Sequence, residues 1–594
     1  VVNITGDITL TSIANVNAKA IGGAAAAAQK AGVGLTITNI INWDAIRAFI
    51  GKSATVTSGG TISLRADADQ ELTTIAVSAA GADKAGVAGV FAVIFTKNVS
   101  KAFIGDSAIV KADDSILLTA TNDTKAFMVA GGAAGAATAG VGGSLAALVI
   151  WNDTLAYIGQ NAITDAKNAT SLEATASELA ITAVISGTGG GNTGVAASLS
   201  TKTIKSNTQA YIGQSAQVNL DPLYASANQT VSLAAIDASI LVGVAGSGTG
   251  GGTAGVGASS DINVITKTVN AFIANAAQVS AVKLVSILAK AAETIISITA
   301  GFAGGGNTGV GGAVAILVVA NSIQAFIGDA ATVFSNGNVL LEALSDLVSV
   351  MLVGSGAGGG TAGVGGSLGV STIISTVLAY IGQNAHVTAL GNGDLANVFT
   401  GAAGKGEETA RGLSLAAYST EIITMIVVSG SGGGSAGVAA SVGANVIKTT
   451  TEAFIKPGAL INETNTGAHA DQEVRLVAVD ETVLTTIVGG GSGGGSAGVG
   501  AASDTGVLVK TTRAYIGNNA SVNANKDIFL SSLSQDVHVS TTAGFGGGGS
   551  AGIGGAVSVS VIANTTESFT GSTVRLNSQN NITLFAADYA TMVL

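Results

Sequence analysis

The sequence predicts an all-β protein: an elongated parallel β-solenoid (β-helix) built from ten 54-residue repeats. Three observations predict this fold. Two short motifs recur ten times at a constant separation, apolar β-branched residues alternate with a period of two, and glycine runs interrupt any helix that would cross them. A regular repeat without helices is typical of a solenoid, in which each coil packs against its neighbours.

The first motif is Ala-aromatic-Ile-Gly, with some copies degenerate at the flanking positions. Successive aromatic residues are separated by 54, 54, 54, 61, 54, 54, 74, 61 and 54 residues. Since equivalent residues of a solenoid stack along its axis, we expect a regularly spaced internal ladder, with each ring contributing about 2 kcal/mol on burial. The ladder residues are Phe49, Phe103, Tyr157, Tyr211, Phe272, Phe326, Tyr380, Phe454, Tyr515 and Phe569.

The second motif is Ala-Gly-Val-Gly, whose first glycine always lies 17 residues before its aromatic partner. Each glycine in a strand costs roughly 0.5–1 kcal/mol relative to alanine. We therefore expect a compensating close approach of backbones, either between two sheets or between a sheet and a neighbouring molecule. These structural glycines are Gly32, Gly86, Gly140, Gly194, Gly255, Gly309, Gly363, Gly437, Gly498 and Gly552.

The repeat predicts one repetitive solenoid over residues 1–594, with insertions of 7, 20 and 7 residues between an aromatic and the next glycine motif. The largest is an insertion loop at 388–411, and 574–594 is a C-terminal partial repeat. Because solenoid coils commonly have roughly 18–30 residues, we expect two or three coils in each unit. In the third unit the apolar runs predict four strands, at 115–120, 125–130, 142–150 and 153–158.

The composition excludes several classes of protein. The 594 residues include no cysteine, only 10% are charged and the net charge is −11, so disulfide scaffolds, thiolate metal sites and nucleic-acid binding are not expected. The 26-residue uncharged stretch 126–151 is long enough to span a bilayer. Its centre is Gly and Ala, however, and no Lys/Arg asymmetry sets a topology, so we predict no membrane insertion.

Two patterns imitate binding sites. G-x-G-x-x-G ends on the repeat glycine in seven units, but a β-branched strand follows it where a dinucleotide site requires a helix, so it is interpreted as a packing motif. His386, His469 and His538 fall at different phases of the repeat, which predicts no metal site. No cofactor is expected; acidic loops such as Asp113-Asp114 leave loop-bound calcium as a weak alternative.

Catalysis would need carboxylates or a basic residue gathered where the repeat is broken. The 20-residue insertion contains such residues, namely Asp394, Lys405, Glu407, Glu408 and Arg411, but its glycine-rich context predicts a flexible loop. No catalytic residue is therefore predicted. Display of this loop as a binding loop from a rigid scaffold is the stronger alternative.

The repeat resembles the repeat regions of very large Gram-negative surface and secreted adhesins, both filamentous-haemagglutinin-like and leukotoxin-like. Gly363-Val-Gly-Gly-Ser367, followed by Leu378-Ala-Tyr-Ile-Gly-Gln-Asn-Ala-His-Val387, shows the resemblance best. It covers essentially the whole chain. The resemblance implies an exported, bacterial, non-catalytic β-helical stalk or fibre that serves adhesion or cell-surface architecture.

These observations predict a non-catalytic extracellular structural protein, a fibre subunit or stalk that self-assembles head-to-tail, laterally or both into filaments at the cell surface. The charge-poor composition suggests sheet faces that another molecule covers. Both end coils look open, and open strand edges template stacking. One alternative is an adhesin stalk whose insertion loops bind glycans or proteins of a host or neighbouring cell. A polysaccharide-active β-helix enzyme is a third, poorly supported alternative.

Overall fold

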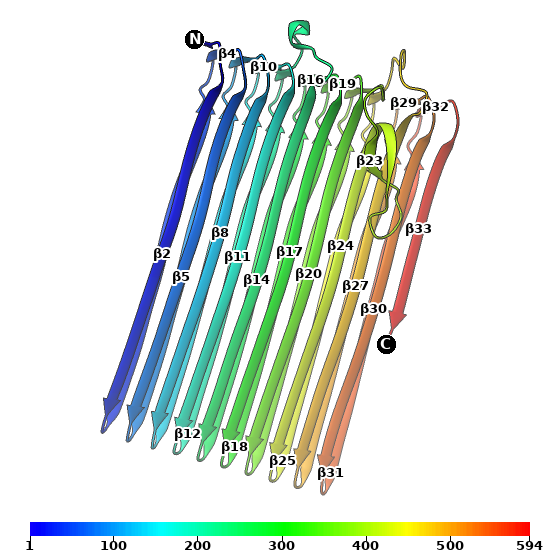
Figure 1. The fold of residues 1–594 in the computed structure, drawn as a ribbon. Helices are drawn as coiled ribbons and strands as arrows, with labels where there is room; N and C mark the ends of the chain where they lie inside the picture. Colours follow the sequence, from blue (N-terminus) through cyan, green and yellow to red (C-terminus); the bar gives the residue numbers. More distant parts are fainter.

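The computed structural model describes all 594 residues, and each 54-residue repeat forms one coil of a parallel β-solenoid (Figure 1). A coil consists of a short strand, a long strand, a tight turn and a second long strand that runs back. Register pairs Val2 with Val56, Ile8 with Ile62 and Ala31 with Ala85, so equivalent residues of adjacent repeats are neighbours in all three sheets. The predicted fold is confirmed, but the expectation of two or three coils per repeat is wrong because the coil is flattened and its strands are unusually long.

The strands form three parallel sheets, named A, B and C. Sheet A contains β1 (Val2–Ile4), β4 (Thr55–Ser58), β7 (Ile109–Ala112), β10 (Ile163–Ala166), β13 (Gln217–Val218), β16 (Gln278–Ala281), β19 (Thr332–Ser335), β22 (His386–Ala389), β26 (Leu460–Ile461), β29 (Ser521–Ala524) and β32 (Arg575–Ser578). Sheet B contains β2 (Ile8–Ala28), β5 (Ile62–Ala82), β8 (Ile116–Ala136), β11 (Ala169–Gly190), β14 (Thr230–Gly251), β17 (Leu284–Gly305), β20 (Asn338–Gly359), β24 (Glu407–Gly433), β27 (Gln472–Gly494), β30 (Ile528–Gly548) and β33 (Ile582–Val593). Sheet C contains β3 (Ala31–Ile50), β6 (Ala85–Ile104), β9 (Ala139–Ile158), β12 (Thr193–Ile212), β15 (Ala254–Ile273), β18 (Thr308–Ile327), β21 (Ala362–Ile381), β25 (Ala436–Ile455), β28 (Ala497–Ile516) and β31 (Ala551–Thr570).

Two elements lie outside these ladders. The strand β23 (Ala396–Phe399) pairs antiparallel with the start of β24, and the 3-10 helix η1 (Pro222–Tyr224) lies in the first insertion. All three insertions lie between sheet A and sheet B, at the opposite end of the coil from the tight turns that join sheets B and C (Figure 1). We call the end with these turns the tip. The chain has no helix that could cross a bilayer.

The four strands predicted in the third unit are in fact two. All but the first residue of 115–120 and all of 125–130 fall in β8, and residues 142–150 and 153–158 fall in β9. The polar residues between the predicted runs do not end the strand because alternation continues through them: Asn122 points inward and is buried, whereas Asp123 points outward. Polar residues inside the molecule were not part of the expected pattern.

The coil is broad in the strand direction and advances little along the solenoid axis. Strands of 20–22 residues extend about 70 Å at roughly 3.3 Å per residue. Neighbouring strands are spaced by about 4.8 Å, so ten coils span only about 48 Å along the axis. The elongation of the molecule therefore lies mostly along its strands.

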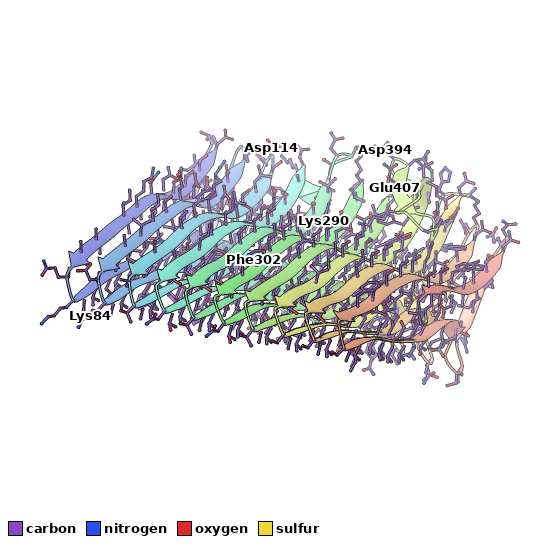
Figure 2. All side chains as sticks on the ribbon, turned by 90° about the horizontal axis from the view of Figure 1, so that it is seen from below. Lys84, Asp114, Lys290, Phe302, Asp394 and Glu407 are labelled. Carbon is purple, nitrogen blue, oxygen red and sulfur yellow. The ribbon has the colours of Figure 1, made fainter.

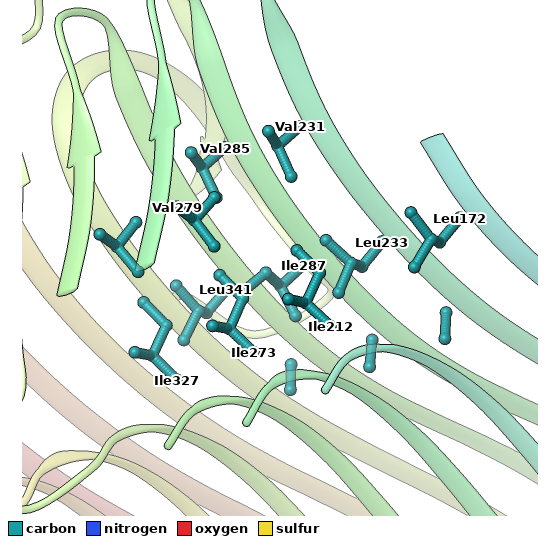
Figure 3. Close-up of a cluster of buried hydrophobic side chains, with 14 of the residues drawn as sticks. Leu172, Ile212, Val231, Leu233, Ile273, Val279, Val285, Ile287, Ile327 and Leu341 are labelled. Carbon is teal, nitrogen blue, oxygen red and sulfur yellow. The ribbon is translucent and has the colours of Figure 1, made fainter. Parts of the chain in front are cut away.

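Two hydrophobic clusters fill the interior between sheets B and C. The larger, of 70 buried residues, lies at the end where sheet A closes the coil, and Figure 3 shows part of it around Leu233, Ile273 and Ile287. The smaller, of 34 buried residues, lies nearer the tip and includes Leu241 and Ile265. The two clusters are separated by a row of polar side chains.

Candidate functional site

The ten ladder residues stack face to face along the axis. Consecutive ring centroids are 4.7–5.0 Å apart and the ring planes differ by only 2–7°. The expectation of an internal ladder is wrong, because the rings lie on the outer face of sheet C. In the first coil, Ala48 and Ile50 point inward and are buried, so strand alternation turns Phe49 outward, where it is 47% exposed.

The nearly parallel ring planes also show that sheet C has little twist. Adjacent strands of an ordinary sheet are rotated by roughly 20–25° relative to each other, and flat sheets are typical of structures stabilised by stacking or side-chain ladders. Figure 1 shows the same feature, since the long strands run side by side with little fanning. The outer face of sheet C is therefore flat.

The ten repeat glycines lie at the tip, where sheets B and C come into backbone contact. A Cβ atom added to any of them would lie 2.6 Å or less from the carbonyl oxygen of another glycine. For Gly140 this oxygen belongs to Gly189 of sheet B in the next coil, and for Gly309 it belongs to Gly358. Real Cβ atoms essentially never come this close, so any side chain at these positions would force the two sheets apart. Close approach of two sheets of the same molecule is thus what compensates for the glycines.

The 388–411 insertion is folded onto the outer face of sheet B. Its strand β23 forms a hairpin with Glu407–Ala410, and Phe399 packs in a small cluster with Leu344, Tyr418 and Leu533. The Tyr418 hydroxyl donates a hydrogen bond to the carbonyl oxygen of Ala402 at 3.1 Å. The expected flexible loop is therefore a hairpin that packs on four neighbouring strands of sheet B.

The charged residues of this insertion do not converge on one point. Lys405 pairs with Asp346, Glu408 pairs with Arg475, and Asp394 lies 2.8 Å from Lys283, each on a different strand or loop of the scaffold. Arg411 donates to the Gly391 carbonyl oxygen at 3.0 Å. These contacts tie the hairpin to the solenoid at separate places.

Between the two hydrophobic clusters runs a row of buried polar side chains that we call the polar seam. It is bordered by Ala235 and Val269 of the larger cluster and by Leu241 and Ile265 of the smaller one. The seam consists of Gln70, Thr124, Glu178, Asp237, Ser239, Glu293, Glu421, Asp480, Thr482 and Asp536 from sheet B and Asn98, Asn152, Ser206, Lys267, Thr449 and Lys510 from sheet C.

Hydrogen bonds connect the seam from coil to coil. The Asn98 amide donates to Asn152 at 3.0 Å, the Asn152 amide donates to Glu178 at 2.6 Å, and the Ser239 hydroxyl donates to the other oxygen of Glu178 at 2.7 Å. In this part of the molecule the seam therefore links coils through side chains as well as through the backbone ladders.

Two lysines with no exposed side-chain surface are the cations of the seam. Lys267 pairs with Asp237 and lies 3.8 Å from Glu178 and 3.5 Å from Glu293. Lys510 lies 2.7 Å from Glu421 and 2.8 Å from Asp480. Burial disfavours a charged ammonium, but the surrounding carboxylates outweigh it and raise the pKa of both lysines.

One ammonium cannot neutralise three buried carboxylates. Burial, together with the neighbouring Asp237, raises the pKa of Glu178 from 4.5 to about 7, and burial likewise raises the pKa of Glu293 to about 7. Around Lys510, burial raises the pKa of Asp480 to about 7, while Lys510 and hydrogen bonds lower the pKa of Glu421. The seam thus holds carboxyl groups that exchange protons near neutral pH.

Sequence reasoning missed the seam because its residues are not repeated. The position of Glu178 is Gln in the second coil, Thr in the third and Ser in the fifth. The sequence did contain a signal for the seam. Charged residues such as Lys267 and Lys510 occur at positions where strand alternation points the side chain inward and where most other residues are apolar. His538 belongs to this class, since it is buried against Ser560 near Asp504, and burial lowers its pKa.

The remaining motifs lie at the tip or on the surface. Each G-x-G-x-x-G crosses the tip, as where β17 ends at Gly305 and β18 begins at Thr308, and no helix follows it. His386 and His469 lie in exposed surroundings at the sheet A end. No group of three or more His, Asp or Glu side chains is arranged to hold a metal ion.

A continuous, mostly apolar and uncovered surface forms the half of the outer face of sheet C nearest the tip, which we call the C face. It comprises five outward columns that run from Val33, Leu35, Ile37, Asn39 and Ile41 in the first coil to Ile553, Gly555, Val557, Val559 and Val561 in the last. None of its positions carries a charged residue. In coils that are flanked on both sides, Val141, Val256, Val364 and Val438 are still 36–41% exposed.

Comparison of the chain with protein-family models, with curated proteins and with solved structures finds no match.

Proposed function

We propose that this protein is a non-catalytic extracellular structural protein, a β-solenoid fibre subunit or stalk that assembles with copies of itself at the cell surface. The observation that carries the proposal is the C face, an uncharged and mostly apolar surface that is continued through all ten coils. Apolar surfaces of this extent mark interaction sites. Its location outside the cell rests on the resemblance of the repeat to those of bacterial surface proteins.

The shape of the coil favours a packing subunit over a simple spacer. Each coil uses 54 residues to advance about 4.8 Å along the axis, whereas the same residues build strands about 70 Å long. A protein that served only as a long spacer would use smaller coils, which give more length along the axis per residue. Most residues of each coil therefore build broad flat sheet faces rather than length along the axis.

Electron microscopy and sedimentation velocity of the purified full chain test the proposal. We expect regular assemblies whose population rises with protein concentration and whose fibre diffraction shows the strand spacing of about 4.8 Å. Monodisperse monomers at the highest attainable concentration would contradict self-assembly. Turnover on a panel of polysaccharides would favour the enzymatic alternative.

The adhesin alternative is tested at the hairpin. Replacing residues 392–409 by a short Gly-Ser linker removes the segment that departs most from the repeat. Loss of binding to cells or glycans, with assembly retained, would favour an adhesin. On the structural proposal both assembly and surface attachment survive the replacement, because the hairpin lies on sheet B, away from the C face.

A further inference from the structure

We propose that the C face is the assembly interface, and that its occupant is the same face of a second copy, packed sheet on sheet. This inference rests on the proposed self-assembly and names the surface that performs it. Four features of the face point to a second copy: its flatness, its relief, its area and its charge.

Flatness decides what can match the face along its whole length. A surface with side chains repeated every coil, about 4.8 Å apart, is matched continuously only by a surface with the same repeat. The small twist, seen in the 2–7° between ladder rings, keeps the columns straight over ten coils. A second copy has both the repeat and the flatness, whereas an ordinary twisted sheet diverges from the face after a few strands.

Large and small columns alternate in the part of the face nearest the tip, whereas the fourth and fifth columns both consist mostly of Val, Ile and Thr. A ridge of valine, with isoleucine in the last coil, adjoins a column of mostly Gly and Ala, and a second ridge of mostly Leu, Ile, Val and Phe lies beyond it. Between the ridges lies a groove of about 520 Å³ over Gly143, Ala197, Ala258 and Gly312. An outward Ala or Thr column flanks the valine ridge on its other side. This part of the face is therefore self-complementary, because a shift by one column fits the ridges of one copy into the small columns of the other.

The area is sufficient for a stable interface. Five columns in ten coils cover about 1,600 Å² per copy at ordinary strand spacings, about twice the roughly 800 Å² per partner of a standard interface. Charged residues such as Lys97, Lys205, Lys448 and Arg513 lie on outward positions beyond the fifth column and form a polar rim on that side. A net charge of −11 would repel copies, but none of that charge lies on the C face.

One part of the outer face of sheet B is covered by another segment of the same chain. Leu344, Tyr418, Val477 and Val479 lie under the 388–411 hairpin and are buried to 8% exposure or less. No segment of the chain covers the C face in this way, which leaves its Val141 and Val364 about 40% exposed.

Opposite charges placed on the face test the pairing. We would prepare Val256→Lys/Val310→Lys and, separately, Val256→Glu/Val310→Glu, both outward positions of adjacent strands in the valine ridge. Each variant alone should associate at least about a hundredfold more weakly than the wild type, because like charges are desolvated across the interface. Mixing the two variants should restore association. Ile422→Lys/Val483→Lys, at exposed and directly paired positions on the outer face of sheet B, is the matched control and should assemble normally.

The outcomes separate the inference from the proposed function. If the valine-ridge variants assemble while the sheet B control does not, the C face is overturned as the interface but self-assembly stands. If the wild type is monomeric at every concentration, self-assembly itself fails. Binding of the monomeric wild type to phosphatidylcholine vesicles, lost in the lysine variant, would assign the face to lipid and overturn pairing. Circular dichroism of each variant confirms folding.

Spin labels measure the geometry directly. Because the chain has no cysteine, Ala258→Cys on the C face and Ala238→Cys on the outer face of sheet B each provide a unique attachment site. Paired sheets pack about 10 Å apart, so labels on Ala258→Cys should show short inter-copy distances in the assembled protein. Short distances from Ala238→Cys alone would overturn the assignment.

Discussion

The polar seam and the glycine tip lie between the same two sheets but are built in opposite ways. At the tip, all ten coils use glycine, and the sheet separation is set by backbone contact. In the seam, the facing residues change from coil to coil, from Gln70 and Asn98 near one end to Asp480 and Lys510 near the other. If sheet C were displaced by one coil relative to sheet B, glycine would still face glycine at the tip, but Lys267 would no longer face Asp237. The repeated element sets the shape of the coil, and we expect the unrepeated one to set the register.

Of the substitutions that test this comparison, Lys267→Met should lower the free energy of unfolding the most. It removes the cation that faces Asp237, Glu178 and Glu293 and leaves buried carboxyls without their partner. Loss of one partner from a buried ion pair typically costs about 3–5 kcal/mol. We expect a lower urea midpoint and faster hydrogen exchange in β15, β14 and β17. Lys290→Met, on the outer face of sheet B (Figure 2), is the control and should change stability by no more than about 0.5 kcal/mol. Equal stability of the two variants would show that the seam ions contribute little.

Stability should fall as the pH rises from about 5 to 8. Carboxyl groups whose pKa is raised on folding bind more protons in the native state, so their contribution is fully present below the unfolded pKa and is lost as the pH passes the folded value. Glu178, Glu293 and Asp480, each with a pKa of about 7, all act in this direction. His538, whose pKa is lowered, acts oppositely below pH 6.5.

Thermal unfolding followed by circular dichroism at several pH values measures this slope. The Glu178→Gln/Glu293→Gln variant keeps the shape of the neutral acids and should flatten the pH dependence. A wild-type stability that does not fall between pH 5 and 8 would show that the seam carboxylates are charged throughout this range in the native protein.

Gly309→Ala tests the tip and should have the smallest of the three effects. The added Cβ would meet the carbonyl oxygens of Gly358 and Ala303, both backbone atoms that cannot move aside independently, so sheets B and C must part. We expect a loss of about 1–3 kcal/mol, as for an overpacked core. The control is Gly358→Ala, whose Cβ would have no atom within 4 Å and should be neutral or stabilising by up to about 1 kcal/mol. If both substitutions are tolerated equally, the tip is not held by backbone contact.

Much of the fold was predictable because it is repeated. The period, the strand class, the constant separation of Gly309 from Phe326 and the close approach at the glycines all follow from residues that recur ten times. The number of coils per repeat was not predictable from coil length alone, since polar residues such as Asn122 and Glu178 interrupt the apolar runs and conceal strands of 20 residues or more. The ladder was predicted to be internal, although the alternation of Ala48, Phe49 and Ile50 already indicates that the aromatic ring and its two apolar neighbours lie on opposite faces of the strand.

The 388–411 hairpin was mistaken for a flexible loop for a related reason. Its glycines and charges are typical of loops, and the contacts that order it, Phe399 on Tyr418 and Lys405 with Asp346, join residues that are distant in sequence. These contacts occur once in the chain and do not recur with the repeat, so no periodic pattern in the sequence predicts them.

By itself, the sequence determined the ten-fold repeat, the β class and the fixed phase of the repeat glycines, because each of these depends on a local pattern that recurs. The tertiary structure alone decided that one repeat is one flattened coil, that lysines and carboxylates meet in a buried seam, and that the apolar columns of sheet C form an uncovered flat face. These features depend on which residues 30 to 90 positions apart face each other across two sheets, and that is fixed by the stacking of coils rather than by any local pattern.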